Sequence, residues 1–423
     1  MTYEEAIDYL YNSLPVFQHS GPGAYKPGLE RISSLDQLFG HPSKGFKSVH
    51  IAGTNGKGST AHSLAAVLQS AGYRTGLYTS PHLHDFRERI RIDGEMIPQE
   101  RVADFVERYR GMDAGIDLSF FELTTIMAFE YFRDEKVDVA IIETGLGGRL
   151  DATNIITPLL SIITNISADH TALLGYTPAA IAAEKAGIIK DSVPVVIGEA
   201  DDKSVREVFE KTAAERNAPL YFARVVDGRL TADGHISYRN TIAGDFTGDL
   251  GGEYQLKNMA TILTALPILK QHFTISDAAI RHGLSDVAAL TGLRGRWMKI
   301  ASHPLTICDT GHNPGGWEYI TRQLQGYPCQ KHIVIGFVAD KDVDEIMKMI
   351  AARIKDATFY FTAPSVERRL DELELQHKAV EAGISGDAYH IPAEALAAAR
   401  QAAAPDELIF IGGSNYLLSE LVI

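Results

Sequence analysis

The chain has 423 residues, of which 45% are apolar and 22% charged, and these ordinary globular proportions exclude a disordered or fibrous protein. The formal net charge of −14 argues against nucleic acid and anionic membranes as partners, because an acidic surface repels polyanions. The apolar runs have strand length, far short of a membrane span. With two cysteines and an acidic N-terminal sequence, we expect a cytoplasmic protein.

Short apolar runs alternate with amphipathic stretches along most of the chain. Apolar strands separated by helices are typical of an α/β fold with parallel sheets. The predicted strands cover residues 48–52, 75–79, 137–142, 159–164, 194–197, 219–222, 305–308, 332–337, 358–361 and 408–411. The predicted helices cover residues 60–70, 102–109, 124–132, 178–186, 205–216, 256–269, 343–354 and 394–402.

The alternation of strands and helices is interrupted before residue 290. Helical patterns follow one another from residue 254 to 289, and a short basic stretch with two glycines, 291–296, then suggests a linker. We therefore predict a large α/β domain over residues 1–293 and a smaller one over residues 294–423. The segment 227–252, rich in Gly, Asp and Thr, is predicted to be a hairpin or loop insertion in the first domain.

The strongest local signal is a strand, a glycine-rich turn and a helix around Gly53-Thr-Asn-Gly-Lys-Gly-Ser59. Such a turn surrounds a phosphate with backbone N–H groups and the positive end of a helix dipole, and Lys57 would reach the terminal phosphates. Gly58 stands where an ordinary P-loop carries the hydroxyl that binds Mg²⁺. Either Ser59 or Thr60 takes over that role, or the metal is held elsewhere.

Polar residues also follow other predicted strands of the first domain. Ser80 and Glu143 each end a strand, and P-loop enzymes hold their metal with a carboxylate in that position. His170 follows a further strand and by itself indicates a loop residue. Lys185 lies within a helical pattern and by itself indicates an exposed helix residue. The charged cluster 87–91 is expected to be a solvated loop.

The second domain repeats this arrangement. Asp309 and His312 follow the strand 305–308, Asp340 and Asp342 follow the next strand, and the last strand ends in the glycine-rich run 412–415. In open parallel sheets, ligands bind just outside the carboxyl ends of the strands. We therefore expect these strand ends to meet and to close a site between the domains.

Taken together, several motifs resemble the folylpolyglutamate synthases and dihydrofolate synthases, which belong to the Mur ligase superfamily. The matching segments are 53–59, 79–83, 143–154, 184–189, 309–314 and 413–414, with 26–32 ahead of them. The resemblance covers nearly the whole chain. It implies a large P-loop, Mur-ligase-like ATPase domain that also binds the pterin, and a smaller Rossmann-like C-terminal α/β domain that closes the ATP and glutamate site.

The resemblance implies an activity and a set of small-molecule partners. ATP would phosphorylate a carboxylate of dihydropteroate or of a reduced folate, and the α-amine of L-glutamate would displace phosphate from that acyl phosphate. Mg²⁺ would be the metal cofactor. The family's members lead us to expect a monomer that carries both the dihydrofolate synthase and the folylpolyglutamate synthase activity.

The resemblance also assigns site residues by matching position. The catalytic residues would be Lys57, Glu143, His170, Lys185 and His312, and Lys185 would be carbamylated. ATP would contact Asn55, Gly56, Lys57, Gly58, Ser59, Asn258, Arg296 and Asp309. Mg²⁺ would contact Ser80, Glu143 and His170. The pterin would contact Phe120, Phe121, Glu122, Leu123, Arg149, Leu150 and Asp151, and glutamate would contact His312 and Ser414.

The sequence departs from the family's pattern at two places. Thr310-Gly311 stands where the family usually has Gly-Ala, and the segment 255–258 is a loose match to the usual His-containing approach to the ATP asparagine. Arg294 is an alternative to Arg296, because both flank Gly295.

Three alternative functions can be compared with the sequence. A Mur ligase acting on a UDP-muramyl chain would need a separate domain of about 100 residues before the P-loop, and only residues 1–52 precede Gly53. A guanine-nucleotide switch protein would carry Asn-Lys-x-Asp, and the chain has no Asn-Lys dipeptide. Within the resembling family, the alternative is a folylpolyglutamate synthase with a single activity.

Overall fold

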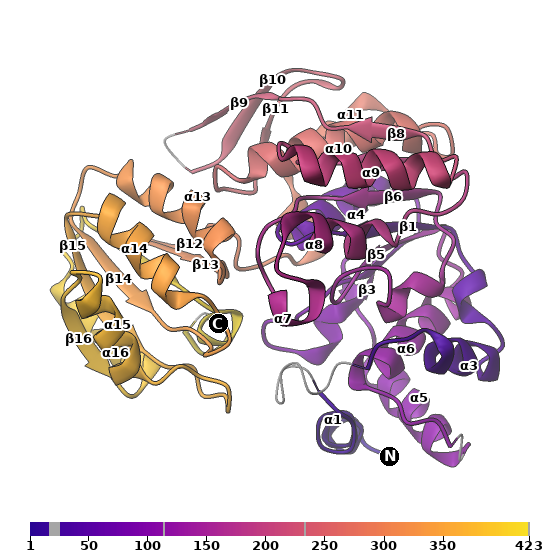
Figure 1. Ribbon diagram of the computed structural model, residues 1–423, viewed down its shortest axis with the longest axis horizontal. Coiled ribbons are helices and arrows are strands. Elements are labelled where there is room, and N and C mark those ends of the chain that lie inside the picture. The colour runs from indigo at the N-terminus through magenta and orange to yellow at the C-terminus, as the bar shows by residue number, and fades with distance from the viewer. Residues whose placement is uncertain (17–25, 113–114, 232–233, 422–423) are drawn as a thin grey trace. The chain divides into compact units, whose positions relative to one another are not determined.

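The computed structural model describes residues 1–16, 26–112, 115–231 and 234–421, and within these ranges the chain forms two compact units (Figure 1). The first unit comprises Met1–Arg229, Ser237–Asp249 and Gln255–Leu293. The second unit comprises Leu230–Ile236, Leu250–Tyr254 and Arg294–Ile423. Two short segments that precede residue 294 therefore belong to the second unit.

An eight-stranded sheet forms the centre of the first unit, in the order β4-β3-β2-β5-β1-β6-β7-β8. Its strands are β1 (Ser48–Ala52), β2 (Thr75–Tyr78), β3 (Ile90–Ile92), β4 (Glu95–Met96), β5 (Val139–Glu143), β6 (Leu160–Ile163), β7 (Val195–Ile197) and β8 (Leu220–Phe222). The six strands from β2 to β8 in this order are parallel, and β3 and β4 form an antiparallel edge. Every residue of β1, β5 and β6 is buried, as expected of parallel strands covered on both faces.

Helices cover both faces of this sheet. The helices of the first unit are α1 (Tyr3–Asn12), α3 (Glu30–Leu38), α4 (Lys57–Ser70), α5 (Gln99–Gly111), α6 (Phe120–Asp134), α7 (Thr171–Leu174), α8 (Pro178–Ala186), α9 (Lys203–Glu215), α10 (Gln255–Leu269), α11 (Asp277–Ser285) and α12 (Val287–Thr291). Helix α4 lies between the sheet and α11, and a β-carbon on Gly283 of α11 would collide with the α4 backbone at Val67. This close approach explains why α4 is buried around its whole circumference.

The segment 227–252 carries a small separate sheet. Its strands β9 (Asp227–Leu230), β10 (Ile236–Thr241) and β11 (Gly244–Gly248) are ordered β11-β10-β9 and precede α10. Residues 232–233 of the predicted insertion lie outside the described residues.

The second unit is built on a six-stranded sheet in the order β12-β13-β17-β14-β15-β16. Its strands are β12 (Met298–Ser302), β13 (Leu305–Asp309), β14 (Lys331–Ile335), β15 (Ala357–Thr362), β16 (Gly386–Tyr389) and β17 (Leu408–Gly412). Its helices are α13 (Pro314–Gln325), α14 (Val343–Arg353), α15 (Glu372–Glu381), α16 (Pro392–Ala402) and α17 (Asn415–Leu421). All strands are parallel except β12 at one edge, and Trp317, Phe337 and Phe410 pack in the core.

The predicted α/β fold with parallel sheets is confirmed, but one local prediction is wrong. The charged cluster 87–91 is not a solvated loop: it forms a short 3-10 helix (Phe86–Arg89) that runs into β3, and the exposed fractions of Arg89 and Arg91 are only 3% and 8%. The Arg89 guanidinium lies over the Phe120 ring, 5.2 Å from its centroid, and its Nε donates to the His82 ring at 2.7 Å. These contacts offset the free-energy cost of burying the Arg89 cation.

Within the described residues, no helix is long and apolar enough to cross a membrane. This agrees with the strand-length apolar runs of the sequence.

Candidate active site

Several predicted site residues of the first unit lie at the carboxyl ends of neighbouring strands. Strands β2, β5, β1 and β6 are parallel neighbours, so their carboxyl ends lie side by side. Ser80 follows β2, Glu143 ends β5, the loop 53–59 follows β1, and the segment 164–170 follows β6. This is the edge at which open parallel sheets bind ligands.

The loop between β1 and α4 has the conformation of a phosphate-binding turn. Gly53 and Gly56 have φ angles of 148° and 83°, which glycine adopts far more readily than other residues. A β-carbon on Gly53 would overlap the Thr164 hydroxyl, and one on Gly56 would overlap the amide oxygen of Asn258. Gly56 caps α4, so the N-terminal N–H groups of that helix point into the loop.

Helix α10 supplies side chains to this loop. Asn258, which the sequence indicates only through a loose match, is buried against Gly56 and donates to the Gln255 side chain at 2.8 Å. Gln255 in turn donates to Ser59 Oγ at 3.2 Å. The structure therefore brings Asn258 together with the predicted phosphate loop.

The segment after β6 braces the same loop from the other side. The Asn55 backbone N–H donates to Asn165 Oδ1 at 2.8 Å, and the Thr54 N–H donates to the Asn165 carbonyl at 3.0 Å. The Thr164 hydroxyl donates to the Asn55 carbonyl at 2.6 Å, and Ser167 N–H donates to Thr54 Oγ1 at 3.1 Å. Sequence reasoning missed these bracing residues, although the polar run that follows the apolar strand was the available signal.

Lys57 and Glu143, predicted from different motifs, lie together. Lys57 Nζ donates to the carbonyls of Gly53 and Thr54 at 3.1 and 3.2 Å and is 4.0 Å from Glu143 Oε1. The other Glu143 oxygen, Oε2, accepts the backbone N–H of Ser80 at 3.1 Å. Glu143 is 3% exposed, so this is a buried carboxylate beside a cation at the phosphate loop.

Lys185 is buried rather than exposed, so the interpretation from the local helix pattern is wrong. Its side chain reaches from α8 to the phosphate loop, where Nζ donates to the Gly53 carbonyl at 2.9 Å, the same oxygen that Lys57 contacts. Burial and the nearby Lys57 cation lower the pKa of Lys185 to about 7. At neutral pH a large share of this amine is therefore unprotonated.

His170 lies just before α7 in a left-handed conformation, with φ at 50°. Its N–H donates to Asp169 Oδ1 at 2.9 Å, and its ring Nε2 lies 3.7 Å from the same oxygen. In the part of the chain that the structure describes, no three His, Cys, Asp or Glu side chains gather in a metal-binding cluster. The contacts join Ser80 to Glu143, and metal binding by Ser80, Glu143 and His170 stays a prediction.

The predicted pterin residues fall into two groups, and the aromatic pair forms the first. The Phe120 ring packs against Tyr11 at a centroid distance of 5.1 Å and lies under the Arg89 guanidinium. The Phe121 ring covers Gly145, where a β-carbon would lie against the ring atoms. Phe121 is thus beside the glycine-rich segment that follows Glu143.

The polar and aliphatic members of the predicted pterin set have local structural contacts. Glu122 accepts from the Ser119 N–H and hydroxyl at 2.8 and 2.7 Å and pairs with Arg31 at 3.1 Å, so it caps α6, and Leu123 is fully buried. Arg149 is exposed and pairs with Glu184 at 2.8 Å, and Leu150 is half-buried.

Asp151 stabilises the conformation of the segment 145–154 through hydrogen bonds. Its buried carboxylate accepts the Leu146 N–H at 2.8 Å and the Thr153 hydroxyl at 2.5 Å, and burial raises its pKa. The same Thr153 hydroxyl accepts a hydrogen bond from His50 of β1 at 2.8 Å.

In the second unit, the strand ends that carry polar residues lie side by side, as expected. Strand β17 lies between β13 and β14, with Gly412 in register with both Asp309 and Ile335. Asp309 is buried, and its carboxylate accepts the Tyr254 hydroxyl at 2.6 Å, the Trp297 N–H at 2.8 Å and the Gly311 N–H at 2.7 Å. Burial raises the pKa of Asp309.

The geometry next to Asp309 favours Arg296 over Arg294. Arg296 donates to the Thr310 hydroxyl and to the Gly295 carbonyl, whereas Arg294 is exposed. Thr310, one of the departures from the family's pattern, therefore contacts a predicted ATP residue.

His312 and Ser414 occupy neighbouring strand ends of the second unit. His312 Nδ1 lies 3.1 Å from the Thr310 carbonyl. Ser414 directly precedes α17, and its buried hydroxyl accepts the N–H of Leu417 in that helix at 3.0 Å. The structure brings these two residues to one edge of the sheet, and their predicted contact with glutamate stays a prediction.

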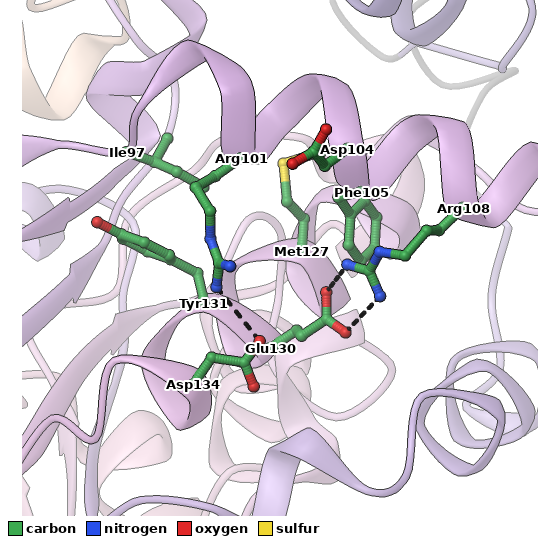
Figure 2. Close-up of a pocket in the computed structure, with 9 residues that line it drawn as sticks. All are labelled: Ile97, Arg101, Asp104, Phe105, Arg108, Met127, Glu130, Tyr131 and Asp134. Carbon is green, nitrogen blue, oxygen red and sulfur yellow. Dashed lines mark hydrogen bonds and ion pairs between the residues drawn. The ribbon is translucent and has the colours of Figure 1, made fainter. Parts of the chain in front are cut away.

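A pocket of about 150 Å³ lies elsewhere in the first unit, between α5 and α6. Figure 2 shows its nine lining residues, which are Ile97, Arg101, Asp104, Phe105, Arg108, Met127, Glu130, Tyr131 and Asp134. Arg108 pairs with Glu130 and Arg101 with Asp134 across it, at 2.5 and 3.2 Å. None of the predicted site residues lines this pocket, and its two arginines already have carboxylate partners.

Comparisons with known proteins match both units. The family model of the Mur ligase middle domain matches residues 51–260, and the model of the Mur ligase, glutamate ligase domain matches residues 295–415. The folylpolyglutamate synthase of Lacticaseibacillus casei is 36% identical over 99% of this chain and 97% of its own length.

Solved structures agree with these matches. The structure of E. coli FolC in complex with DHPP and ADP is similar with a TM-score of 0.85 and 30% identity, over 100% of this chain and 97% of that chain. A bifunctional folylpolyglutamate synthase/dihydrofolate synthase from Yersinia pestis, complexed with AMPPNP and Mn ion, has a TM-score of 0.81 and 31% identity, over 100% of this chain and 97% of that chain.

Proposed function

Because the chain belongs to the folylpolyglutamate synthase/dihydrofolate synthase family of Mur ligases, we propose that it adds L-glutamate to dihydropteroate and to reduced folates at the expense of ATP. The observation that carries the proposal is the pairing of Lys57 with the buried Glu143 carboxylate at a phosphate-binding turn, with the Lys185 amine on the same loop carbonyl as Lys57. The first product would be dihydrofolate, and further additions would give folylpolyglutamates.

The reaction joins a carboxylate to an amine in two steps. The γ-phosphoryl group of ATP passes to the carboxylate of the pterin substrate, which gives an acyl phosphate and ADP. The α-amine of glutamate then attacks the carbonyl carbon, the bond to the phosphate oxygen breaks, and inorganic phosphate and a proton leave. Lys57 and the loop N–H groups hold the phosphates during the first step.

The residues beside the phosphate loop fit a magnesium ion. Mg²⁺ takes oxygen ligands and is often bound through one or two carboxylates together with substrate phosphates. Glu143 offers a buried carboxylate beside Ser80 and 4.0 Å from Lys57. We assign Glu143 and Ser80 to Mg²⁺, with His170 as a further ligand. A cation held there would supply positive charge to neutralise the phosphoryl group during its transfer.

We assign the remaining substrate contacts by unit. In the first unit, we assign residues 55–59 and Asn258 to ATP. For Arg296 and Asp309, contact with ATP stays a prediction. Of the predicted pterin residues, we assign the accessible Phe121, Arg149 and Leu150 to contact with the pterin, and the buried Phe120, Glu122, Leu123 and Asp151 to the packing behind them. Glutamate contacts His312 and Ser414. We expect a monomer in the cytoplasm with only these small molecules as partners.

Lys185→Ala is expected to lower ligation at least about 100-fold, and acetate is expected to restore part of it. Carbamylation requires an unprotonated amine, which adds to carbon dioxide and releases a proton, and a pKa of about 7 makes that form available at neutral pH. The resulting carboxylate would face cations where an ammonium is repelled. Acetate supplies the missing carboxylate when the side chain is removed.

The measurement is the initial rate of product formation with and without added acetate. Lys190→Ala is the matched control, because Lys190 is also a lysine whose pKa is lowered by burial, but it donates to the Asn154 carbonyl instead. Acetate should leave the activity of that variant unchanged. A Lys185→Ala variant with normal activity, or one that acetate does not restore, contradicts carbamylation.

The proposed function is tested by the mass of the product. The purified protein is incubated with ATP, Mg²⁺ and L-glutamate, together with either dihydropteroate or tetrahydrofolate. We expect one added glutamyl unit on dihydropteroate and a ladder on tetrahydrofolate. A product in only one tube would reduce the assignment to a single activity, and absence of product in both would refute the assigned substrates.

A further inference from the structure

We propose that His50 is a positioning residue that holds the pterin-binding segment at a fixed place relative to the phosphate loop. The inference rests on the proposed function, in which the accessible Arg149 and Leu150 contact the pterin substrate. It concerns the first unit alone, to which all these residues belong. His50 lies outside the motifs that carry the family resemblance, and the reaction described above uses no group of its side chain.

His50 is a polar residue in the middle of a buried strand. In the sheet it lies opposite Ile142 of β5 and Ser161 of β6. The ring is fully buried, and burial lowers the pKa of His50 to about 3, so the ring is neutral. Within the described residues, its Nδ1 atom has no hydrogen-bond partner. An apolar residue at this position would avoid the cost of that unpaired atom, so we expect the histidine to act through its other nitrogen.

The other ring nitrogen begins a chain of hydrogen bonds. Thr153 Oγ1 lies 2.8 Å from His50 Nε2 and 2.5 Å from Asp151 Oδ1. The Asp151 carboxylate also accepts the backbone N–H groups of Leu146 and Thr153, at 2.8 and 3.0 Å, so it acts as an acceptor. The Thr153 hydroxyl has a single proton and donates it to Asp151, and its oxygen therefore accepts the Nε2–H of His50.

The chain of hydrogen bonds ends at a closed loop. The Asp151 side chain accepts the N–H at the other end of the segment 146–151, so it joins the two ends of that segment. The accessible Arg149 and Leu150 lie between these ends. Because His50 fixes the hydroxyl that holds the Asp151 carboxylate, it also restrains the loop that the carboxylate closes.

The same histidine is fixed relative to the phosphate loop. β1 ends at Ala52, and the phosphate loop begins at Gly53, three residues beyond His50. One buried strand thus carries both the phosphate loop and the N–H group that restrains the pterin segment. Phosphoryl transfer needs the acceptor carboxylate aligned with the γ-phosphate, and a misplacement of about 1 Å can cost about 100-fold in rate. We therefore assign His50 to the alignment of these two substrates.

The test compares His50→Leu with His50→Gln. Leucine fills the buried position without a donor, whereas the glutamine amide offers an N–H group at about the reach of Nε2. For His50→Leu we expect kcat/KM for dihydropteroate to fall about 10- to 100-fold, with Kd for ADP changed less than about twofold. His50→Gln should recover most of that loss. The Tm of His50→Leu should stay near the wild-type value, because leucine leaves no buried nitrogen unpaired.

His62→Leu is the matched control. His62 is another buried histidine of the first unit, and its Nδ1 lies 2.8 Å from the Thr291 hydroxyl. The substitution removes the same kind of hydrogen bond from a different place, so kcat/KM for dihydropteroate should remain unchanged.

A second pair of variants acts on the middle of the chain of hydrogen bonds. Thr153→Val removes the hydroxyl and should reproduce the loss seen in His50→Leu, whereas Thr153→Ser keeps the hydroxyl and should behave like the wild type. In the double variant of His50→Leu and Thr153→Val the losses should not add, because both changes break the same connection.

The outcomes separate this inference from the proposed function. Normal dihydropteroate kinetics in His50→Leu, or in Thr153→Val if His50→Leu does not fold, overturn the inference while a ligating wild type keeps the function. Equal weakening of ADP and dihydropteroate together with a lower Tm also overturns it, because that result indicates a structural role alone. Additive losses in the double variant do the same. A wild type that makes no product overturns both.

Discussion

Lys57→Ala is expected to lower kcat/KM for ATP about 100- to 1,000-fold while the protein remains folded. The Lys57 ammonium lies at the loop carbonyls of Gly53 and Thr54, and loss of one preorganised electrostatic contact to a transition state costs about 100- to 1,000-fold. Its side chain is partly exposed, so its removal leaves no buried cavity of consequence. The measurement is glutamyl transfer at saturating folate, with the thermal unfolding midpoint as the test of folding.

The control for this experiment is a lysine far from the loop. Lys203 begins α9, is 90% exposed and forms only a surface pair with Glu207, so Lys203→Ala should behave like the wild type. Near-normal turnover in Lys57→Ala would mean that the phosphates of ATP bind elsewhere.

Glu143→Gln should be nearly as damaging, and it tests the metal assignment more directly than alanine. Glutamine keeps the shape and an oxygen that accepts the Ser80 N–H, but it removes the charge beside Lys57. We expect a loss of about 100-fold or more in kcat, and a higher Mg²⁺ concentration for half-maximal activity, because a neutral amide is a poorer ligand for a hard cation.

Two comparisons make the Glu143 result decisive. Glu143→Ala should abolish ligation, whereas Glu135→Gln, which breaks only a surface pair with Arg74, should change nothing. An unchanged Mg²⁺ requirement in Glu143→Gln would contradict a role of this carboxylate in holding the metal.

The parts of the fold and site that depend on local sequence could be predicted. An apolar run that ends in glycines and a lysine before a helix specifies the phosphate turn by itself, and the buried strands of both sheets have continuous apolar runs. The edge strands β4, β12 and β16 and the strand β3 next to an edge were missed, because short, partly polar strands depend on a neighbouring strand for their pairing.

The parts that depend on distant packing could not be predicted from local pattern. Lys185 has the spacing of a surface residue, and only the fold shows its amine buried at Gly53. Asn258 lies about 200 residues along the chain from the loop that it contacts, and no local pattern records that contact. The neighbours of Arg89 in the sequence are charged, whereas in the fold its guanidinium lies over the aromatic ring of Phe120.

The brace formed by the segment after β6 has a thermodynamic consequence for nucleotide capture. Thr164, Asn165 and Ser167 already hold Thr54 and Asn55 in a loop shaped for a phosphate. Ordering a mobile backbone costs about 1–2 kcal/mol per residue, and a braced loop has met that entropic cost during folding. Nucleotide binding should therefore proceed by docking onto a rigid surface, with an association rate that is limited by encounter rather than by loop closure.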